Sequence, residues 1–540
     1  MTSSTETDPS TWTITSSIAA HARNRPDHPA VICQDREVSY GRLHRSSNRT
    51  AHALLAAGLR TGSRVAYLGR ESEHYYDLVL GCVKSGVVLV PINWRLTSVE
   101  VDHVLRDSGA ELVFTQSGFR GVVDRMRAEL PELRAVVDMD SAAGTGEGFL
   151  SWQASHDESD LEPVTGPDDP IVQMYTSGTT GLPKGVVLAH RTYFTFDANM
   201  KRAGLDWIDW RSSDVALISF PGLHSGGMAW FMFGIVAGST NVIMTMFDPE
   251  EAVRLIRRHR VTNTFAAPAM LQMMLDESAA TPEGFRSLRK VVYGGAPMSE
   301  HVMLRCIAEF GCELTQMYAS AETGSVVTCL PPHEHVPGGP KLRSAGRPCP
   351  GNDVRILDER RRPLPPGQIG QISVFSPAHF VEYWNNPQAT ERVLHDGWLD
   401  MPDAGYLDDD GYLYVCDRIN DMIIVAGQNI YPVEVENALL AANPAVAEVA
   451  VVGQVDERWG EIAKAVVVRR DGEQVTGREL MRSLHGRIAD FKIPTVYEFV
   501  DRLPRNPTGK VMRRLLRDPI HQQPGNAEPR HDQPTYPRGN

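Results

Sequence analysis

Signals for membranes, disulfides and common zinc sites are missing from this 540-residue sequence. It contains no run of 18 apolar residues, and its amino terminus lacks a basic stretch followed by an apolar core, so we expect no membrane span and no secretory signal. Its seven cysteines include no C-x-x-C pair, which excludes the common zinc motifs and argues against a disulfide framework. We therefore expect a cytoplasmic protein that works in a reducing compartment.

Positive charge is also scarce. The sequence has 54 lysines and arginines against 67 acidic residues, and a surface with this net charge of −13 repels nucleic-acid phosphates. We therefore expect no nucleic-acid partner. ATP and coenzyme A are not excluded, because a phosphate needs only a local cluster of N–H groups and cations. Lysine occupies only eight positions, so a lysine in a candidate loop is less easily explained as a surface residue without function.

Strands and helices alternate in the first half of the chain. Apolar patterns predict strands at residues 64–68 and 87–90, with a helix at 75–84 between them. Thr97 and Glu100 form a capping box that starts another helix, and Gly109 ends it. This alternation predicts the α/β class, with a large N-terminal domain of several subdomains whose mostly parallel sheets are covered by helices.

A change of composition near residue 417 predicts a second, smaller domain of the α+β class. Its expected elements are a helix at 433–442, strands at 446–452 and 463–469, and a helix at 479–488. From residue 519 the chain is rich in Pro, Gln, Asn and charged residues, which predicts a disordered tail. The predicted organisation is a large N-terminal domain at 11–416, a hinge at 417–421, a small C-terminal domain at 422–518 and the tail at 519–540.

A loop of small residues at 175–185 is the most informative segment. It follows the apolar residues 171–174, and its glycines and hydroxyls let backbone N–H groups converge on phosphate oxygens. It is not the phosphate loop of the common ATPases, because Lys184 is preceded by Pro183 and followed by Gly185. The residues predicted to hold phosphate are Thr176, Ser177, Gly178, Thr179, Thr180, Gly181 and Lys184.

The loop resembles the signature of the acyl-adenylate-forming superfamily, which includes acyl-CoA synthetases, stand-alone adenylation enzymes and beetle luciferases. Further motifs similar to those of that family follow in its order along nearly the whole chain, at 293–297, 318–322, 403, 417–418 and 506–510. The resemblance implies an enzyme that uses ATP to join a carboxylic acid to AMP, with the closest pattern that of the acyl-CoA synthetases.

The resemblance implies a role for residues in each motif. Glu322 would bind Mg²⁺, Asp403 would bind the ribose, and Lys510 would be the lysine of the adenylation step. A carboxylate that attacks the α-phosphate of ATP must overcome the repulsion between two anions, so Mg²⁺, Lys184 and Lys510 would supply the positive charge. The other nucleotide contacts implied are Gly295, Ala296, Pro297, Tyr318 and Arg418.

The acid site is implied by the same resemblance. Similar segments place a histidine, here His224, beside the substrate carboxylate. Gly222, Leu223 and Ser320 are small where bulkier residues are usual in the family, which indicates room for a wide ring system. Ala319 instead replaces a usual Gly and narrows the pocket. We therefore expect a hydrophobic acid, and a bulky or cyclic acid rather than a linear long chain. The residues implied to contact the acid are His224, Ser225, Met228, Gly294, Ala319 and Ser320.

A second half-reaction is implied after the hinge. Gly427, Gln428 and Asn429 resemble the loop that lines the pantetheine tunnel of acyl-CoA synthetases. Rotation of the small domain at the hinge would let this loop replace Lys510 at the site, so that a thiolate can attack the acyl carbonyl and expel AMP. The expected substrates are ATP, a small-molecule carboxylic acid and coenzyme A. The oligomeric state is left open, with a homodimer as one option.

Three positions depart from the family pattern. Asn420 occupies the hinge position where Lys or Asp is usual, and residues 401–402 replace the usual Thr-Gly. Ala321 replaces a Thr, and the missing hydroxyl predicts nucleotide binding weaker by about 1 kcal/mol. Two alternatives stay open, a stand-alone adenylation enzyme that loads a carrier protein and a nucleotide-binding scaffold without catalysis. The retained Glu322 and Lys510 argue against the scaffold.

Overall fold

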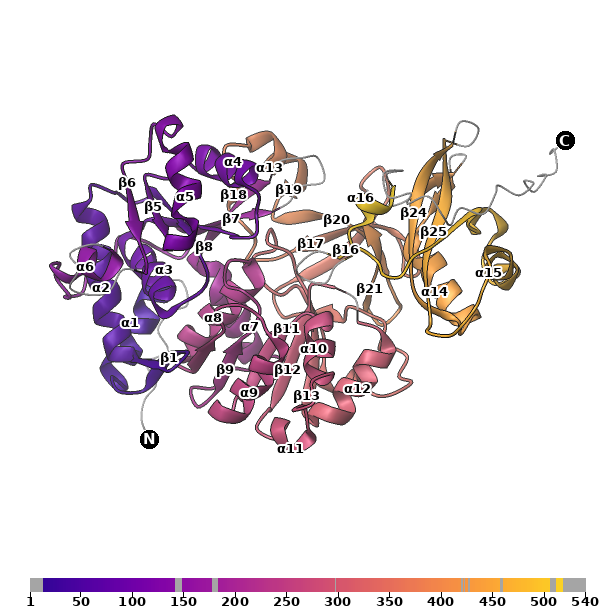
Figure 1. Ribbon diagram of the computed structural model, residues 1–540, viewed down its shortest axis with the longest axis horizontal. Helices are drawn as coiled ribbons and strands as arrows, with labels where there is room; N and C mark the ends of the chain where they lie inside the picture. The colour runs from indigo at the N-terminus through magenta and orange to yellow at the C-terminus, as the bar shows by residue number, and fades with distance from the viewer. Residues whose placement is uncertain are drawn as a thin grey trace. The chain divides into compact units, whose positions relative to one another are not determined.

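The chain divides into two compact units (Figure 1). The first unit is Met1–Val354, Ser373–Asp400 and Gly411–Leu413, and the second is Arg355–Ile372, Met401–Asp410 and Tyr414–Asn540. The predicted hinge at 417–421 stays a prediction, and the predicted tail at 519–540 lies outside the described residues. The computed structural model describes residues 13–140, 148–176, 183–296, 298–418, 421, 423–425, 428–456, 460–505 and 511–517.

The first unit contains a nine-stranded sheet among its described residues, in the order β15-β14-β13-β12-β11-β9-β10-β1-β2. The strands from β13 to β1 in this order run parallel, and antiparallel strands complete both edges. Their bounds are β1 (Pro29–Cys33), β2 (Arg36–Ser39), β9 (Val215–Ile218), β10 (Thr240–Ile243), β11 (Asn263–Ala266), β12 (Lys290–Gly294), β13 (Glu313–Tyr318), β14 (Thr328–Leu330) and β15 (Arg347–Pro348).

A seven-stranded sheet, counted over the described part of the first unit, has the order β18-β8-β7-β4-β3-β5-β6. Strands β7, β4, β3, β5 and β6 run parallel, whereas β8 and β18 are antiparallel to their neighbours. Their bounds are β3 (Arg64–Leu68), β4 (Val88–Ile92), β5 (Leu112–Thr115), β6 (Ala135–Asp138), β7 (Pro170–Thr176), β8 (Lys184–Ala189) and β18 (Glu382–Tyr383).

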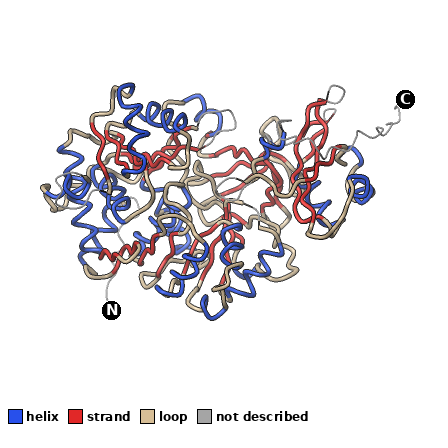
Figure 2. Tube along the Cα trace, in the orientation of Figure 1, coloured by secondary structure: helices blue, strands red, loops and turns tan. Residues whose placement is uncertain are grey.

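Helices pack against both sheets (Figure 2), and α3 contacts a strand of each, β1 and β4. Apolar side chains of α9, α10 and α12 pack with those of β9 to β13 in one core cluster, in which Ile256, Leu271 and Val291 are fully buried. The helices of the first unit are α1 (Ile14–Asn24), α2 (Tyr40–Ala56), α3 (Glu73–Ser85), α4 (Ser98–Ser108), α5 (Ser117–Met126), α6 (Phe149–Ala154), α7 (Thr195–Ala203), α8 (Ser225–Ala237), α9 (Pro249–His259), α10 (Pro268–Leu275), α11 (Pro282–Phe285), α12 (Glu300–Phe310) and α13 (Pro387–Val393). No helix in the described residues is long and apolar enough to cross a membrane.

The α/β class predicted from the sequence is confirmed, and so are the local signals behind it. The predicted strand at 64–68 is β3. The capping box of α4 is present, because Glu100 N–H donates to Thr97 Oγ1 at 3.3 Å and Thr97 N–H donates to Glu100 Oε2 at 2.8 Å. Gly109 ends this helix in the left-handed region with φ of 62°.

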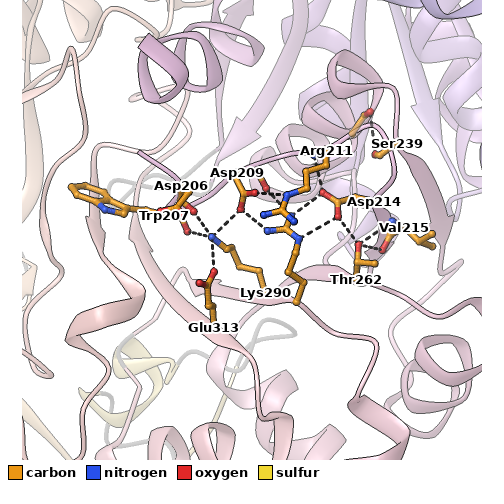
Figure 3. A network of polar contacts seen from close by, with 12 residues as sticks. Asp206, Trp207, Asp209, Arg211, Asp214, Val215, Ser239, Thr262, Lys290 and Glu313 are labelled. Atoms are coloured by element: carbon orange, nitrogen blue, oxygen red, sulfur yellow. Dashed lines mark hydrogen bonds and ion pairs between the residues drawn. The ribbon is translucent and has the colours of Figure 1, made fainter. Parts of the chain in front are cut away.

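A network of ion pairs fixes the amino ends of β12 and β13 to the chain before β9 (Figure 3). Lys290, the first residue of β12, is almost fully buried, and its Nζ lies 3.0 Å from Asp209 Oδ1 and 3.0 Å from Glu313 Oε2. Arg289 donates to Asp209 at 2.5 Å and to Asp214 at 2.9 Å. Burial raises the pKa of Asp209, but the hydrogen bonds from Lys290 and Arg289 outweigh it and lower that pKa to about 2. Asp209 is therefore ionised at neutral pH and paired with both Lys290 and Arg289.

The second unit has its own small core around a five-stranded sheet, taken over the residues described there. The sheet has the order β23-β22-β25-β24, and β26 pairs with β25 in parallel. The predicted helix at 479–488 is four residues too long at its end, because His485 has an extended ψ of 132° and Gly486 a φ of 74°. The bounds are β22 (Ile423–Val425), β23 (Gln428–Ile430), α14 (Pro432–Ala442), β24 (Val446–Asp456), β25 (Gly460–Arg469), α15 (Gly477–Leu484), β26 (Val496–Phe499) and α16 (Arg513–Arg517).

A further five-stranded sheet occurs among the described residues. Its order is β16-β17-β20-β19, with β21 paired to β20. The bounds are β16 (Asp353–Leu357), β17 (Gly370–Phe375), β19 (Leu394–His395), β20 (Trp398–Leu407) and β21 (Leu413–Arg418).

Candidate active site

Three predicted motifs follow parallel strands of the nine-stranded sheet. His224 lies six residues beyond the end of β9, Gly295 and Ala296 follow β12, and Glu322 follows β13. Because neighbouring parallel strands end at the same edge of a sheet, this edge gathers the loops that can bind a ligand. Gly295 has a φ of 78°, a conformation that favours glycine, so the chain turns sharply where the adenine-binding loop is predicted.

The predicted phosphate loop connects two antiparallel strands. Strand β7 ends at Thr176 and β8 begins at Lys184, and these two residues are direct partners in the ladder. Lys184 is half-buried at the start of a strand, so its backbone position is fixed by the sheet.

A tyrosine joins the predicted phosphate lysine to the predicted metal ligand. The hydroxyl of Tyr383 donates a 2.8 Å hydrogen bond to Oε1 of Glu322. The ammonium nitrogen of Lys184 lies 5.3 Å from the centre of the same ring, within the range of a cation–π contact. Tyr383 belongs to β18 and stands opposite Val186 of β8, so the pairing of two strands brings the three side chains together.

The turn that carries Glu322 is fixed by the segment before Tyr383. Phe380 N–H donates to Glu322 O at 2.9 Å, and the Ser376 hydroxyl donates to Thr323 O at 3.2 Å. Gly324 has a φ of 71°, and a Cβ there would lie 1.9 Å from the carbonyl oxygen of Ala378. Only glycine fits this close approach, so the turn and the segment are packed backbone against backbone.

The Glu322 carboxylate suits a hard divalent cation. In the described part of the chain only its Oε1 is engaged, by Tyr383, and Oε2 can bind a cation. No group of three His, Cys, Asp or Glu side chains that could hold a metal lies among the described residues. A cation at Glu322 would therefore take its other ligands from phosphate oxygens and water, the usual arrangement for Mg²⁺.

His224 stands at the amino end of α8 and contacts the other sheet's loops. Its Nε2 lies 3.4 Å from Nδ2 of Asn93, which directly follows β4. Burial and then the charge of Arg95 lower the pKa of His224 to about 4. The imidazole is therefore neutral at pH 7 and brings no net charge to a bound carboxylate.

The loop before His224 is held by a buried carboxyl group. Gly222 N–H donates to Glu71 Oε1 at 2.8 Å, the Tyr76 hydroxyl donates to the same oxygen, and the Tyr75 hydroxyl donates to Gly222 O at 3.0 Å. A Cβ on Gly222 would lie 2.5 Å from the Tyr76 hydroxyl oxygen. The missing side chain of Gly222 is thus required by packing, and it is not evidence for a wide acid pocket.

Other residues predicted to contact the acid have local structural partners. Thr323 N–H donates to the Ser320 hydroxyl at 3.2 Å, which explains a small polar residue there. A Cβ on Gly294 would lie 2.6 Å from Met317 O. Met228 is fully buried in α8, Ser225 is the first residue of that helix, and Ala319 is half-buried after β13.

The remaining predicted residues lie in the second unit or outside the described residues. Asp403 lies in β20 and Arg418 ends β21, both in the second unit, and Gln428 and Asn429 lie in β23. Of Arg418, Gln428 and Asn429 only the backbone is described. Ser177, Gly178, Thr179, Thr180, Gly181, Pro297, Asn420, Gly427 and Lys510 lie outside the described residues.

Three residues of the site were missed by sequence reasoning. Asn93 could have been predicted as a site residue, because it is polar and lies shortly after the strand predicted at 87–90. Tyr383 and Glu71 could not have been predicted, since neither lies in a motif and their partners are distant in sequence.

Two family models match the chain one after the other. The model of AMP-binding enzymes matches residues 18–384, and the model of the AMP-binding enzyme C-terminal domain matches residues 434–510. The second match ends at the predicted adenylation lysine, Lys510.

Full-length relatives and solved structures are similar to the chain. Fatty acid–[acyl-carrier-protein] ligase ScoC of Streptomyces coeruleorubidus is 50% identical over 512 residues, which cover 94% of this chain and 97% of that protein. A feruloyl-CoA synthase of an Amycolatopsis species is 37% identical over 92% of this chain and 96% of its own. The structure of o-succinylbenzoate CoA synthetase (MenE) from Bacillus subtilis with the acyl-adenylate intermediate OSB-AMP matches with a TM-score of 0.80 and 31% identity, covering 93% of this chain and 98% of that one.

Proposed function

Because the chain belongs to the family of AMP-binding enzymes within the acyl-adenylate-forming superfamily, we propose that it activates a hydrophobic carboxylic acid as an acyl adenylate and transfers the acyl group to a phosphopantetheine thiol. The observation that carries the proposal is the arrangement of Lys184 and Glu322 around Tyr383. It gathers a cation for phosphate and a carboxylate for a metal beside the loop that follows β13.

Adenylation exchanges one anhydride bond for another. A carboxylate oxygen attacks the α-phosphorus of ATP, the bond from that phosphorus to the bridging oxygen breaks, and pyrophosphate leaves. Mg²⁺ at Glu322 would neutralise phosphate charge when bound. We assign Lys184 and Lys510 to the phosphate oxygens, and neutral His224 to orienting the acid without adding charge.

The nucleotide's other contacts are proposed from the family pattern. Gly295, Ala296 and Tyr318 lie beyond or at the ends of the neighbouring strands β12 and β13, where an adenine ring could be held between two loops. Asp403 is proposed to accept hydrogen bonds from the ribose hydroxyls. Arg418 and the hinge at 417–421 remain proposals of the same kind.

The acceptor is proposed to be a carrier protein, with coenzyme A as the second candidate. The relative with 50% identity is named as an acyl-carrier-protein ligase, which supports the first. The names of the feruloyl-CoA synthase and of MenE support the second. Either acceptor attacks the acyl carbonyl as a thiolate, AMP leaves, and the thiol proton passes to solvent. Gly427, Gln428 and Asn429 are proposed to line its approach.

The acid is proposed to be hydrophobic, and fatty acids are the first class to test. The relatives' names include a fatty acid and a feruloyl group, so they support an apolar acid without fixing its shape. The expectation of a bulky or cyclic acid loses much of its support, because Gly222 and Ser320 are small for reasons within the chain.

Exchange of labelled pyrophosphate into ATP tests the activation step. Exchange should require both an acid and Mg²⁺, and a panel of linear and cyclic acids should rank the acid classes. AMP release is then compared with a phosphopantetheinylated carrier protein and with coenzyme A as the only acceptor. Absence of exchange with every acid would favour the non-catalytic scaffold, and faster AMP release with coenzyme A would reverse the order of acceptors.

A further inference from the structure

We propose that Tyr383 is a positioning residue whose hydroxyl holds the Glu322 carboxylate in the orientation that binds the divalent cation of the nucleotide. The inference rests on the proposed function, in which Glu322 binds that cation. It adds a residue that lies outside every motif recognised in the sequence.

The hydrogen bond fixes the Glu322 carboxylate at one oxygen. Tyr383 donates to Oε1 at 2.8 Å and leaves Oε2 for a cation. A glutamate side chain has three rotatable bonds, so a half-buried carboxylate without this partner would sample several orientations. Partners of this kind commonly change metal affinity by about 10–100-fold.

The ring itself is held from several sides. Tyr383 pairs with Val186 through β18 and β8, and its N–H donates to the Thr390 hydroxyl at 2.9 Å. The centre of its ring lies 4.9 Å from the centre of the Phe380 ring, in an edge-to-face arrangement. It is only 8% exposed. A rigid ring can position a carboxylate, whereas a mobile one could not.

Tyr383 contacts Lys184 with its ring and Glu322 with its hydroxyl, so a substitution can remove one contact and keep the other. The face of its ring lies 5.3 Å from the Lys184 ammonium and its hydroxyl meets Glu322. Tyr383→Phe keeps the ring and the contact with Lys184 but removes the hydrogen bond. We therefore expect this variant to lose cation affinity while it keeps its affinity for metal-free ATP.

The test measures Mn²⁺ binding to the ATP-bound full chain by electron paramagnetic resonance, with no turnover required. Tyr383→Phe should weaken Mn²⁺ binding at least about ten-fold. Exchange activity, measured separately, should need correspondingly more Mg²⁺ but approach the wild-type rate at saturation. Tyr193→Phe is the matched control, because the Tyr193 hydroxyl is fully buried and has no hydrogen-bond partner in the described residues.

A double-mutant cycle with Glu322→Gln keeps the inference testable if Tyr383→Phe also loses stability. Adding Tyr383→Phe to Glu322→Gln should change Mn²⁺ binding little, because the route through the carboxylate is already lost. Unchanged Mn²⁺ affinity in Tyr383→Phe, or an equal loss in the Glu322→Gln background, would overturn the inference. A wild-type protein that binds Mn²⁺ with ATP but shows no acid-dependent exchange would instead count against the proposed function.

Discussion

Glu71 and Gly222, 151 positions apart, are joined by a 2.8 Å hydrogen bond from the glycine N–H to a fully buried carboxyl oxygen. Burial raises the pKa of Glu71 to about 8, although hydrogen bonds from Tyr76 and Gly222 lower it. The carboxyl group is therefore mostly protonated at neutral pH. It connects the start of α3 to the loop that leads to His224.

The pKa of Glu71 predicts a pH-dependent stability. Between about pH 4.5 and 8 the folded state keeps a proton that the unfolded state has lost, so this residue's contribution to stability falls as pH rises through that window. Glu71→Gln keeps an acceptor oxygen and cannot ionise. The midpoint of thermal unfolding of the variant should rise relative to wild type as pH increases from 5 to 8, by at least about 2 °C. Glu300→Gln on the exposed start of α12 controls for net charge, and an equal gain there would contradict the assignment.

Gly222→Ala should destabilise the chain without selecting among acids. The added Cβ would lie 2.5 Å from the Tyr76 hydroxyl oxygen and 2.8 Å from Glu71 Oε1, and such overpacking costs about 1–3 kcal/mol. The measurements are thermal unfolding and exchange activity with small and large acids. Gly118→Ala in α5 is the control, because a Cβ there meets nothing within 4 Å. A selective loss of large acids at unchanged stability would restore Gly222 as a pocket residue.

Ala321→Ser should improve ATP binding by restoring a hydroxyl before Glu322. One neutral hydrogen bond contributes about 1 kcal/mol, which corresponds to about five-fold in affinity. Ala321 is only 7% exposed, so we prefer Ser, which adds only the hydroxyl group. Ala321→Thr is the second variant, and it also adds a methyl group to this buried position. Equilibrium titration with ATP checks the prediction. If both variants bind ATP as wild type does, the departure at Ala321 has no effect on the nucleotide.

Lys510→Ala should slow acyl-adenylate formation by about 100-fold or more, because one cation is removed from a crowded group of phosphate oxygens. Transfer from a chemically prepared acyl adenylate to the thiol should continue. Lys492→Ala is the control within the second unit, where Lys492 Nζ donates to Glu434 at 2.7 Å. Equal adenylation rates in wild type and Lys510→Ala would remove the proposed mechanism.

His224 should leave no inflection in the pH profile of the exchange reaction between pH 6 and 8. Its pKa of about 4 keeps the ring neutral over that range. The profile of His224→Gln should therefore have the same shape as that of wild type at a lower rate. A break near pH 6.5 in wild type that disappears in the variant would show that the ring titrates in the working range.

The sequence was sufficient for features whose cause is local. The strand at 64–68 and the capping box of α4 depend on neighbouring residues, and both are where the pattern predicts them. The predicted end of α15 was wrong because the apolar period continues past His485, whereas Gly486 turns the backbone.

Contacts between distant segments could not be read from the sequence. Tyr383 lies 61 positions from Glu322, and only the pairing of β18 with β8 brings it to Lys184. At Gly222 the sequence was interpreted as making room for a ligand, whereas the space is taken up by Tyr76. A glycine looks the same in a sequence in both cases. Motifs predicted the site residues, and packing between distant segments determines what surrounds them.

The charged cluster at Lys290 lies at the amino edge of the nine-stranded sheet, whereas the loops with His224 and Glu322 leave from the carboxyl edge. Ion pairs thus hold these strands together at the edge opposite to the one from which the predicted ligand loops leave. Changes in these loops therefore leave the register of the strands intact, except at Gly222 and Gly324, which packing requires to be glycine.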